Sequence, residues 1–473
     1  MKNANRLRQV FIIIAIFSLS RILTLVIGLH LSSWPLYTYW QYLDVNTLKN
    51  HLLRGVWYDH AQPPVFNLFL GIVLKMGGSE STLLFAAFLK MISLANGQLI
   101  FSILRKISVP GYLPMFAALV YLLSPATLIF ENELFYTTVV SLFLLIGVYF
   151  LIRFTFSGNS WNALGIFFPL TLLCLTRSVY HIIWLIILCA VLLYYFRNKP
   201  SYKKLILPSL ISILIVGGWY LKNKLIFGHF TSSTWVGMNM ARNVFHDNVP
   251  GDSSQIEAYA PFSRISVYRK FLDPRFEENY KGLNDADLLE EMKNDSFINE
   301  TEVSYIRVSE LYQRAGLHYI RTHPGSYAKN VFQSTVLYFT PATVYSLAVE
   351  QSKKIKGYDL LYSLNGTHFA QNKQQRRILL TISAIPKMII YFLVFFILIR
   401  QCIRDRSISA WNLFLMLTIG FVFGVGSFFE HYENMRFRFE TEPLFLVLEA
   451  QVIGILFTAF KNRHRPLVQQ EID

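Results

Sequence analysis

Long apolar segments separated by short charged ones set the pattern of this chain. Most of the apolar runs have about 18 or more residues, the length of a helix that crosses a hydrocarbon core of about 30 Å. The expected spans are 9–31, 82–104, 110–130, 135–156, 160–177, 179–197, 204–221, 377–400, 409–428 and 443–461. The pattern therefore predicts an all-α polytopic membrane protein with about ten transmembrane helices.

Composition supports this class. The 473 residues are 53% hydrophobic and only 15% charged, with a mean hydropathy of +0.38, which excludes a soluble globular domain. The run 9–31 lacks a small-residue cleavage site, so it reads as a retained helix rather than a signal peptide. Cys174, Cys189 and Cys402 fall in or beside apolar segments, and no disulfide framework is implied.

The net charge of +15 is explained by topology rather than by nucleic-acid binding. Much of the excess lies at the ends of apolar runs, as the positive-inside rule requires. These clusters are Lys2, Arg6 and Arg8; Arg105 and Lys106; Arg197, Lys199, Lys203 and Lys204; Arg400, Arg404 and Arg406; and Lys461, Arg463 and Arg465. With both termini inside, the segments facing outside are 32–63, 131–133, 222–376 and 430–442, and a short turn at 177–181 joins them.

Three parts follow from this pattern. Residues 1–221 form a membrane module with its first external loop at 32–63. Residues 222–376 form a large external segment of mixed composition, suited to a small α-rich domain on the membrane face. Residues 377–473 hold the last transmembrane helices.

The run 65–76 has about a dozen residues, too short for a span. We expect an interfacial or re-entrant helix there and a single crossing through 82–104. The alternative, a short span at 65–76 followed by another, would place Arg105 and Lys106 outside.

The first external loop carries the most specific pattern. Its apolar residues recur near helical spacing at Leu43, Leu48, Leu52, Val56 and Trp57, which predicts a surface helix with Asp44 at its start. The "QPPV" sequence at 62–65 ends that helix, because proline cannot continue one, and turns the chain toward the bilayer.

An acidic residue, a surface helix and a Pro-Pro entry to an apolar run resemble the first external loop of the GT-C glycosyltransferases. This superfamily includes the protein O-mannosyltransferases and lipid A aminoarabinose transferases of glycosyltransferase family 39. The chain has "LD" where "DE" is frequent and "QPPV" where "PPL" is usual. It has Lys90 in place of an arginine, and Glu131 and Glu133 after "SP" where aspartate is common. The resemblance covers about the first 220 residues at motif level and the rest by architecture.

The resemblance implies a GT-C-like helical bundle with an external loop domain in a bacterial inner (plasma) membrane, its active site facing the periplasm. It implies transfer of a sugar from a polyprenyl-phosphate donor to a glycan, lipid or protein acceptor, with Asp44 as general base. Lys90, Arg177, Arg436 and Arg438 are the expected phosphate contacts, since basic groups in or beside the membrane are functional by default.

Other polar residues stay open to two interpretations. Asp59, His60, Gln62, Glu131, Glu133 and His181 are candidate substrate-binding residues. Asp59 and His60 with Glu131 or Glu133 could instead bind a divalent metal, although no ligand spacing is diagnostic and no cofactor is certain.

The structural alternatives are also open. Asp44 would then only cap a helix, and Lys90 would only extend its amine to the membrane interface. The remaining residues would be interfacial anchors: Arg177, His181, Arg436 and Arg438. A lipid-linked sugar flippase or a polysaccharide polymerase or ligase is the alternative function.

Overall fold

The computed structural model describes residues 2–245, 292–293 and 297–463. Within these ranges the protein is a helical bundle, with one short antiparallel pairing between β1 (Met292–Lys293) and β2 (Phe297–Ile298). The prediction of an all-α polytopic membrane protein is confirmed.

Ten apolar helices lie within or over the expected spans. Seven helical segments of the described chain are long and apolar enough to cross a membrane, and three shorter apolar helices, α7, α10 and α11, accompany them. The ten helices are α1 (Lys2–Val26), α6 (Ser81–Lys106), α7 (Leu113–Leu123), α9 (Thr137–Ser157), α10 (Ser160–Cys174), α11 (Ile182–Phe196), α12 (Lys203–Phe227), α20 (Lys373–Asp405), α21 (Ala410–Phe429) and α22 (Asn434–Arg463).

The first loop folds into three short helices: α2 (Pro35–Thr38), α3 (Val45–Asn50) and α4 (Leu52–Tyr58). The single surface helix expected there is divided at His51, whose backbone leaves the helical region with φ −128° and ψ 30°. Asp44 stands directly before α3, at the start of the helical pattern as predicted.

The Pro-Pro sequence opens α5 (Pro64–Gly77), and the chain reverses through η1 (Gly78–Glu80) into α6. The Phe69 ring lies 5.9 Å from Phe85 and 6.1 Å from Phe88, so α5 packs beside α6 instead of extending it. The 14 residues of α5 reach about 21 Å, less than the hydrocarbon thickness. The length is that expected of an interfacial or re-entrant helix, whereas the reversal is common to that expectation and to the alternative of two spans.

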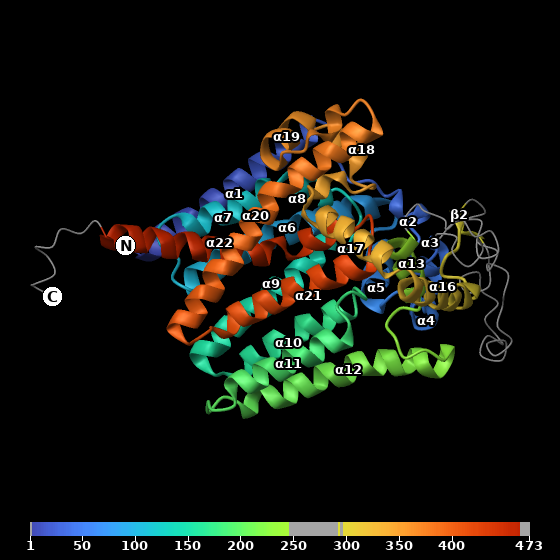
Figure 1. Cartoon of the computed structure of the whole chain (residues 1–473), viewed down its shortest axis with the longest axis horizontal. Coiled ribbons are helices and arrows are strands. Elements are labelled where there is room, and N and C mark those ends of the chain that lie inside the picture. The colour runs from blue at the N-terminus through green and yellow to red at the C-terminus, as the bar shows by residue number, and fades with distance from the viewer. Residues whose placement is uncertain (1, 246–291, 294–296, 464–473) are drawn as a thin grey trace, which may run out of the picture.

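The large segment adds helices at one end and along one flank of the bundle (Figure 1). These are α13 (Val236–Phe245), α16 (Ser304–Thr322), α17 (Pro324–Phe339), α18 (Val349–Lys353) and α19 (Lys356–Ser363), with the short turns η6 (Ala342–Val344) and η7 (Gly366–Phe369). Figure 1 shows α2, α3, α4, α13 and α16 gathered opposite the start of α1 and the end of α22. We call the end that carries these helices the loop end.

The start of α22 differs from the expected loop at 430–442. The helix begins at Asn434, and Arg436, Arg438 and Glu440 are buried in it. Arg436 has glutamates three and four residues away, Glu433 and Glu440, and Arg438 has Glu442 four residues away. These pairings let charged residues continue the helix into the bundle. Similarly, α12 continues to Phe227, six residues beyond the expected end of its span.

Candidate active site at the loop end

A buried cluster of ion pairs lies where α22 meets the turn between α10 and α11. Arg436 is fully buried, pairs with Glu433 one turn earlier, and lies 3.8 Å from Glu440. Arg177, from the α10–α11 turn, also pairs with Glu440. Arg242 of α13 lies 3.9 Å from Glu433. Three guanidinium groups are thus brought together by α22, by the α10–α11 turn and by α13.

Aromatic rings enclose this cluster. The Arg436 guanidinium lies 4.6 Å from the ring centroid of Phe135, 5.2 Å from that of Tyr136 and 5.3 Å from that of Tyr345. Arg177 lies 4.1 Å from the Phe437 centroid. Ring faces stabilise cations that have lost much of their water, which helps to explain how these arginines are buried.

The carboxyl groups of the cluster do not all carry charge. Burial, together with the neighbouring Glu433, raises the pKa of Glu430 to about 8, so Glu430 is mostly protonated at neutral pH. Burial alone would raise the pKa of Glu433 too, but Arg436 and Arg242 outweigh it and hold that pKa below its ordinary value. Arg242 also lies 3.9 Å from Glu430, so the three arginines face three carboxyl groups, of which Glu430 is the one that burial makes easiest to protonate.

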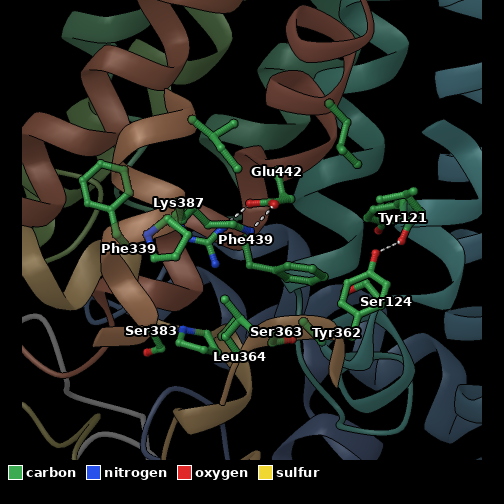
Figure 2. Close-up of a pocket in the computed structure, with 18 residues that line it drawn as sticks. Tyr121, Ser124, Phe339, Tyr362, Ser363, Leu364, Ser383, Lys387, Phe439 and Glu442 are labelled. Carbon is green, nitrogen blue, oxygen red and sulfur yellow. Dashed lines mark hydrogen bonds and ion pairs between the residues drawn. The ribbon is translucent and has the colours of Figure 1, made fainter. Parts of the chain in front are cut away.

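One turn further along α22, a cavity of about 190 Å³ opens between α7, α8 (Pro125–Phe130), α17, α19, α20 and α22. Its wall is largely apolar but includes Lys387, Arg438 and Glu442. Glu442 pairs with Arg438 and, at 2.6 Å, with Lys387; Figure 2 shows its carboxylate facing Lys387 beside the ring of Phe439. Two cations and one carboxylate thus line an apolar cavity, an arrangement that suits an amphiphile with an anionic group.

Asp44 has one occupied and one free oxygen. Its Oδ1 accepts the backbone N–H of Asn46 at 2.7 Å and so caps α3. Its Oδ2 is buried and has no hydrogen-bond donor among the described residues. The helix-cap interpretation is therefore correct for Oδ1, whereas Oδ2 has its hydrogen-bonding capacity unused.

Asp59 is held by its own loop. Its Oδ1 accepts the backbone N–H groups of Ala61 at 2.8 Å and Gln62 at 3.0 Å, and its Oδ2 accepts the Asn67 side-chain amide at 3.1 Å. Burial raises the pKa of Asp59 to about 6, although these bonds and Lys222 oppose the rise. Asp59 thus fixes the turn before the prolines, and Gln62 contributes its backbone to that turn.

His60 and His181 have structural contacts. The His60 ring is fully buried, with Nδ1 2.7 Å from the Thr234 hydroxyl and Nε2 2.9 Å from the Thr301 carbonyl oxygen. Burial lowers the pKa of His60 to about 3, so the ring is neutral and ties the first loop to the large segment. His181 caps α11 by accepting the Ile183 N–H.

Lys90 and Glu131 belong to a second buried group. Glu131 accepts two bonds from Arg21 of α1, at 2.8 and 2.7 Å, and Lys90 donates to the Asn132 side chain at 3.0 Å. Glu133 is only 6% exposed, and burial raises its pKa to about 8, against a weaker opposing effect of Lys354. At neutral pH Glu133 therefore holds a proton and is unsuited to act as a base.

Metal binding gains no support from this geometry. Within the described ranges, no three His, Cys, Asp or Glu side chains lie close enough to hold an ion. The Asp59 carboxylate and both ring nitrogens of His60 are engaged with protein atoms.

Several residues of the site were not identified from sequence. They are Arg21, Arg242, Lys387, Glu430, Glu433, Glu440 and Glu442. For the four glutamates a signal was present: "EHYENMRFRFETEP" spaces acidic and basic residues by three and four, as in a helix whose charges pair. Lys387 is a lone cation within an apolar run, which is a signal in a membrane helix.

Comparisons with known proteins return loose likenesses. No family model matches the chain, and no curated protein matches it. The S. cerevisiae protein O-mannosyltransferase Pmt1–Pmt2 complex bound to the sugar donor is 15% identical, with a TM-score of 0.33, over 50% of this chain. The chain spans only 37% of that structure's length. ArnT from Cupriavidus metallidurans in the apo state is 12% identical, with a TM-score of 0.33. The match covers 93% of this chain and 77% of the ArnT chain.

Likenesses as distant as these do not transfer an activity or a residue role. What the structure defines is the class: a polytopic helical membrane protein with a buried, cation-rich site at its loop end.

Proposed function

We propose that the protein is a glycosyltransferase that moves a sugar from a polyprenyl-phosphate donor to an acceptor on the outer face of the membrane. The loop end is the outer end in this proposal. The acceptor is a glycan, lipid or protein. The lipid of the donor stays in the bilayer, and its phosphate and sugar enter the site from the membrane side.

The observation that carries the proposal is the excess of buried positive charge at the loop end. Arg177, Arg242 and Arg436 gather around Glu430, Glu433 and Glu440. One turn away, Lys387 and Arg438 share the single carboxylate of Glu442, so cations outnumber carboxylates at the cavity. Burying net charge is costly unless an opposite charge joins it. The phosphate of a membrane-bound donor is an anion of suitable charge, and the apolar wall of the cavity suits its lipid.

Asp44 supplies the base. The acceptor hydroxyl oxygen bonds to the anomeric carbon while the bond from that carbon to the phosphate oxygen breaks. Polyprenyl phosphate leaves with the electron pair, and the hydroxyl proton passes to the free Oδ2 of Asp44. The arginines and Lys387 stabilise the charge on the departing phosphate.

Asp44→Asn tests the base role, because it removes proton acceptance while keeping the size and most of the capping ability. General-base catalysis contributes roughly 10²–10⁴-fold, so we expect transfer to fall by that factor with an unchanged thermal midpoint. Asp44→Ser also preserves a cap and should lose activity equally. Lys49→Gln, on the exposed side of α3, is the matched control. If Asp44→Asn kept more than about a tenth of the activity, Asp44 would only cap the helix.

A labelled polyprenyl-phosphate sugar separates transfer from flipping. Incubated with the purified protein and a cell-envelope extract as acceptor source, the label should leave the lipid and enter a new glycosidic product. Movement of the intact labelled lipid between leaflets of vesicles, with no new product, would instead identify a flippase.

A further inference from the structure

A groove of about 810 Å³ lies between α17 and α20, on the flank of the bundle near the loop end. Its floor and walls are largely apolar, with Phe332, Leu337 and Leu380 among the lining residues. Lys329, Arg376 and Arg377 also line it. The groove therefore combines an apolar trough with a basic edge.

A second pocket of about 590 Å³ adjoins the first and shares Val344 and Arg376 with it. It is formed by α18, α19, η7 and the start of α20, and it is lined by three further lysines, Lys353, Lys356 and Lys373. Together the two pockets bear six cations, which we call the basic rim: Lys329, Lys353, Lys356, Lys373, Arg376 and Arg377.

The rim is poorly neutralised by the protein. Lys353 pairs with Glu350 at 2.6 Å, and both side chains are exposed. The other five cations have no carboxylate within ion-pair distance in the described part of the chain. All six are exposed, unlike the buried arginines of the site at α22. If the loop end is the outer end, these cations also run counter to the positive-inside rule, which places Lys and Arg on the cytoplasmic side.

An exposed apolar surface begins directly below the rim. On α20, Ile378, Ile382 and Ile385 follow Arg376 and Arg377 and are 47–55% exposed. Leu361, at 83% exposure, and Phe369, at 50%, lie beside the second pocket, on α19 and η7. A band of cations bordering exposed apolar side chains lies at the depth where lipid phosphates meet hydrocarbon.

We propose that the basic rim binds the phosphate headgroup of an anionic phospholipid in the leaflet at the loop end, with an acyl chain in the α17–α20 groove. The site is separate from the cavity at Lys387, and the inference does not depend on the proposed transfer reaction. A soluble anion would match the charge but would leave the apolar groove and the exposed isoleucines without a partner. An anionic lipid matches both.

The test uses the full chain, purified and placed in nanodiscs, with fluorescent phosphatidylglycerol as the probe in a phosphatidylcholine background. Since each cation near an anionic lipid surface contributes about a factor of five to binding, Arg376→Gln/Arg377→Gln should weaken the probe's affinity roughly 25-fold. Arg404→Gln, an exposed arginine paired with Asp405 on the same helix, is the control and should leave affinity unchanged. Equal thermal midpoints in phosphatidylcholine establish that both variants are folded.

Competition identifies the occupant. Unlabelled phosphatidylglycerol should displace the probe, whereas inorganic phosphate and glycerol 3-phosphate at matched concentrations should not. Displacement by free phosphate would identify a site for soluble anions and overturn the proposal. It would also be overturned if the double variant bound the probe as wild type does, or if polyprenyl phosphate displaced it more effectively than phosphatidylglycerol.

Discussion

Basic residues at the two ends of the bundle meet different conditions. At the end opposite the loop end, Lys106, Arg197, Arg400 and Arg404 are exposed. At the loop end, Arg177 and Arg436 are at most 3% exposed and pair with Glu440 of α22 and with Glu433 just before that helix. The same residue type is therefore exposed at one end and enclosed by partners at the other.

The difference shows what a charge count can reveal in a membrane protein. Each exposed cation affects the orientation of the protein in the membrane independently of the others. Its position along the sequence is therefore enough to predict its role. Buried cations need partners, and those partners come from α10–α11, α13 and α22. A cation that groups from other helices enclose is thus the one to examine for a site.

Cysteine labelling tests the assignment of the two ends, with an all-or-none outcome. In a Cys402→Ser background, Gly325→Cys on α17 should react with an impermeant maleimide applied from outside, and Asn198→Cys should be protected until the membrane is opened. Both positions are exposed, and a Cβ at Gly325 meets no atom within 4 Å. The reverse labelling pattern would invert the topology and place the proposed site inside.

Arg436→Met should have the largest effect on stability. It leaves Glu433 and Glu440 buried without one of their cations, and breaking a buried pair from one side costs about 3–5 kcal/mol. Arg400→Met, at the opposite end, removes an exposed cation and should change the free energy of unfolding by less than about 0.5 kcal/mol. Denaturant unfolding in detergent measures both. Equal losses would mean that burial does not distinguish the two ends.

His60 predicts how pH acts on the loop end. Its folded pKa, about 3, lies below the ordinary value near 6.5, so the unfolded chain binds more protons between these limits. The stabilising contribution is therefore complete above about pH 6.5 and is lost as pH falls, by about 2 kcal/mol at pH 5. Unfolding of His60→Gln should show a correspondingly weaker dependence over this range, and the exposed His51→Gln should match wild type. Identical pH profiles for His60→Gln and wild type would contradict the assignment.

Lys387→Met, in the cavity between α20 and α22, should have the smallest of the effects predicted here. The change keeps the length of the side chain and deletes its charge, so we expect the apparent donor KM to rise about tenfold while the acceptor KM stays unchanged. Lys75→Met, an exposed lysine at the end of α5, is the control. A rise in acceptor KM alone would show that the cavity does not receive the donor.

Much of the fold follows from local sequence. Spans such as α9 and α21 are predictable because an apolar run of that length must form a helix that satisfies its own backbone in lipid. Asp44 as the start of a helix was also predictable, since the signal lies within a few residues. The prolines at 63–64 likewise determine locally where α5 begins.

The partners of charged residues were decided only by the tertiary structure. Arg177 and Glu440 are far apart in sequence, as are Arg21 and Glu131, and no local pattern joins them. Lys90 and Arg436 looked equivalent as candidate phosphate contacts, yet one bonds to Asn132 and the other is enclosed by two glutamates and a ring of aromatic side chains. Hydrophobic length acts within one segment, so the sequence alone determines it. The state of a buried charge depends on which groups other helices bring within a few ångströms, so only the packed bundle determines it.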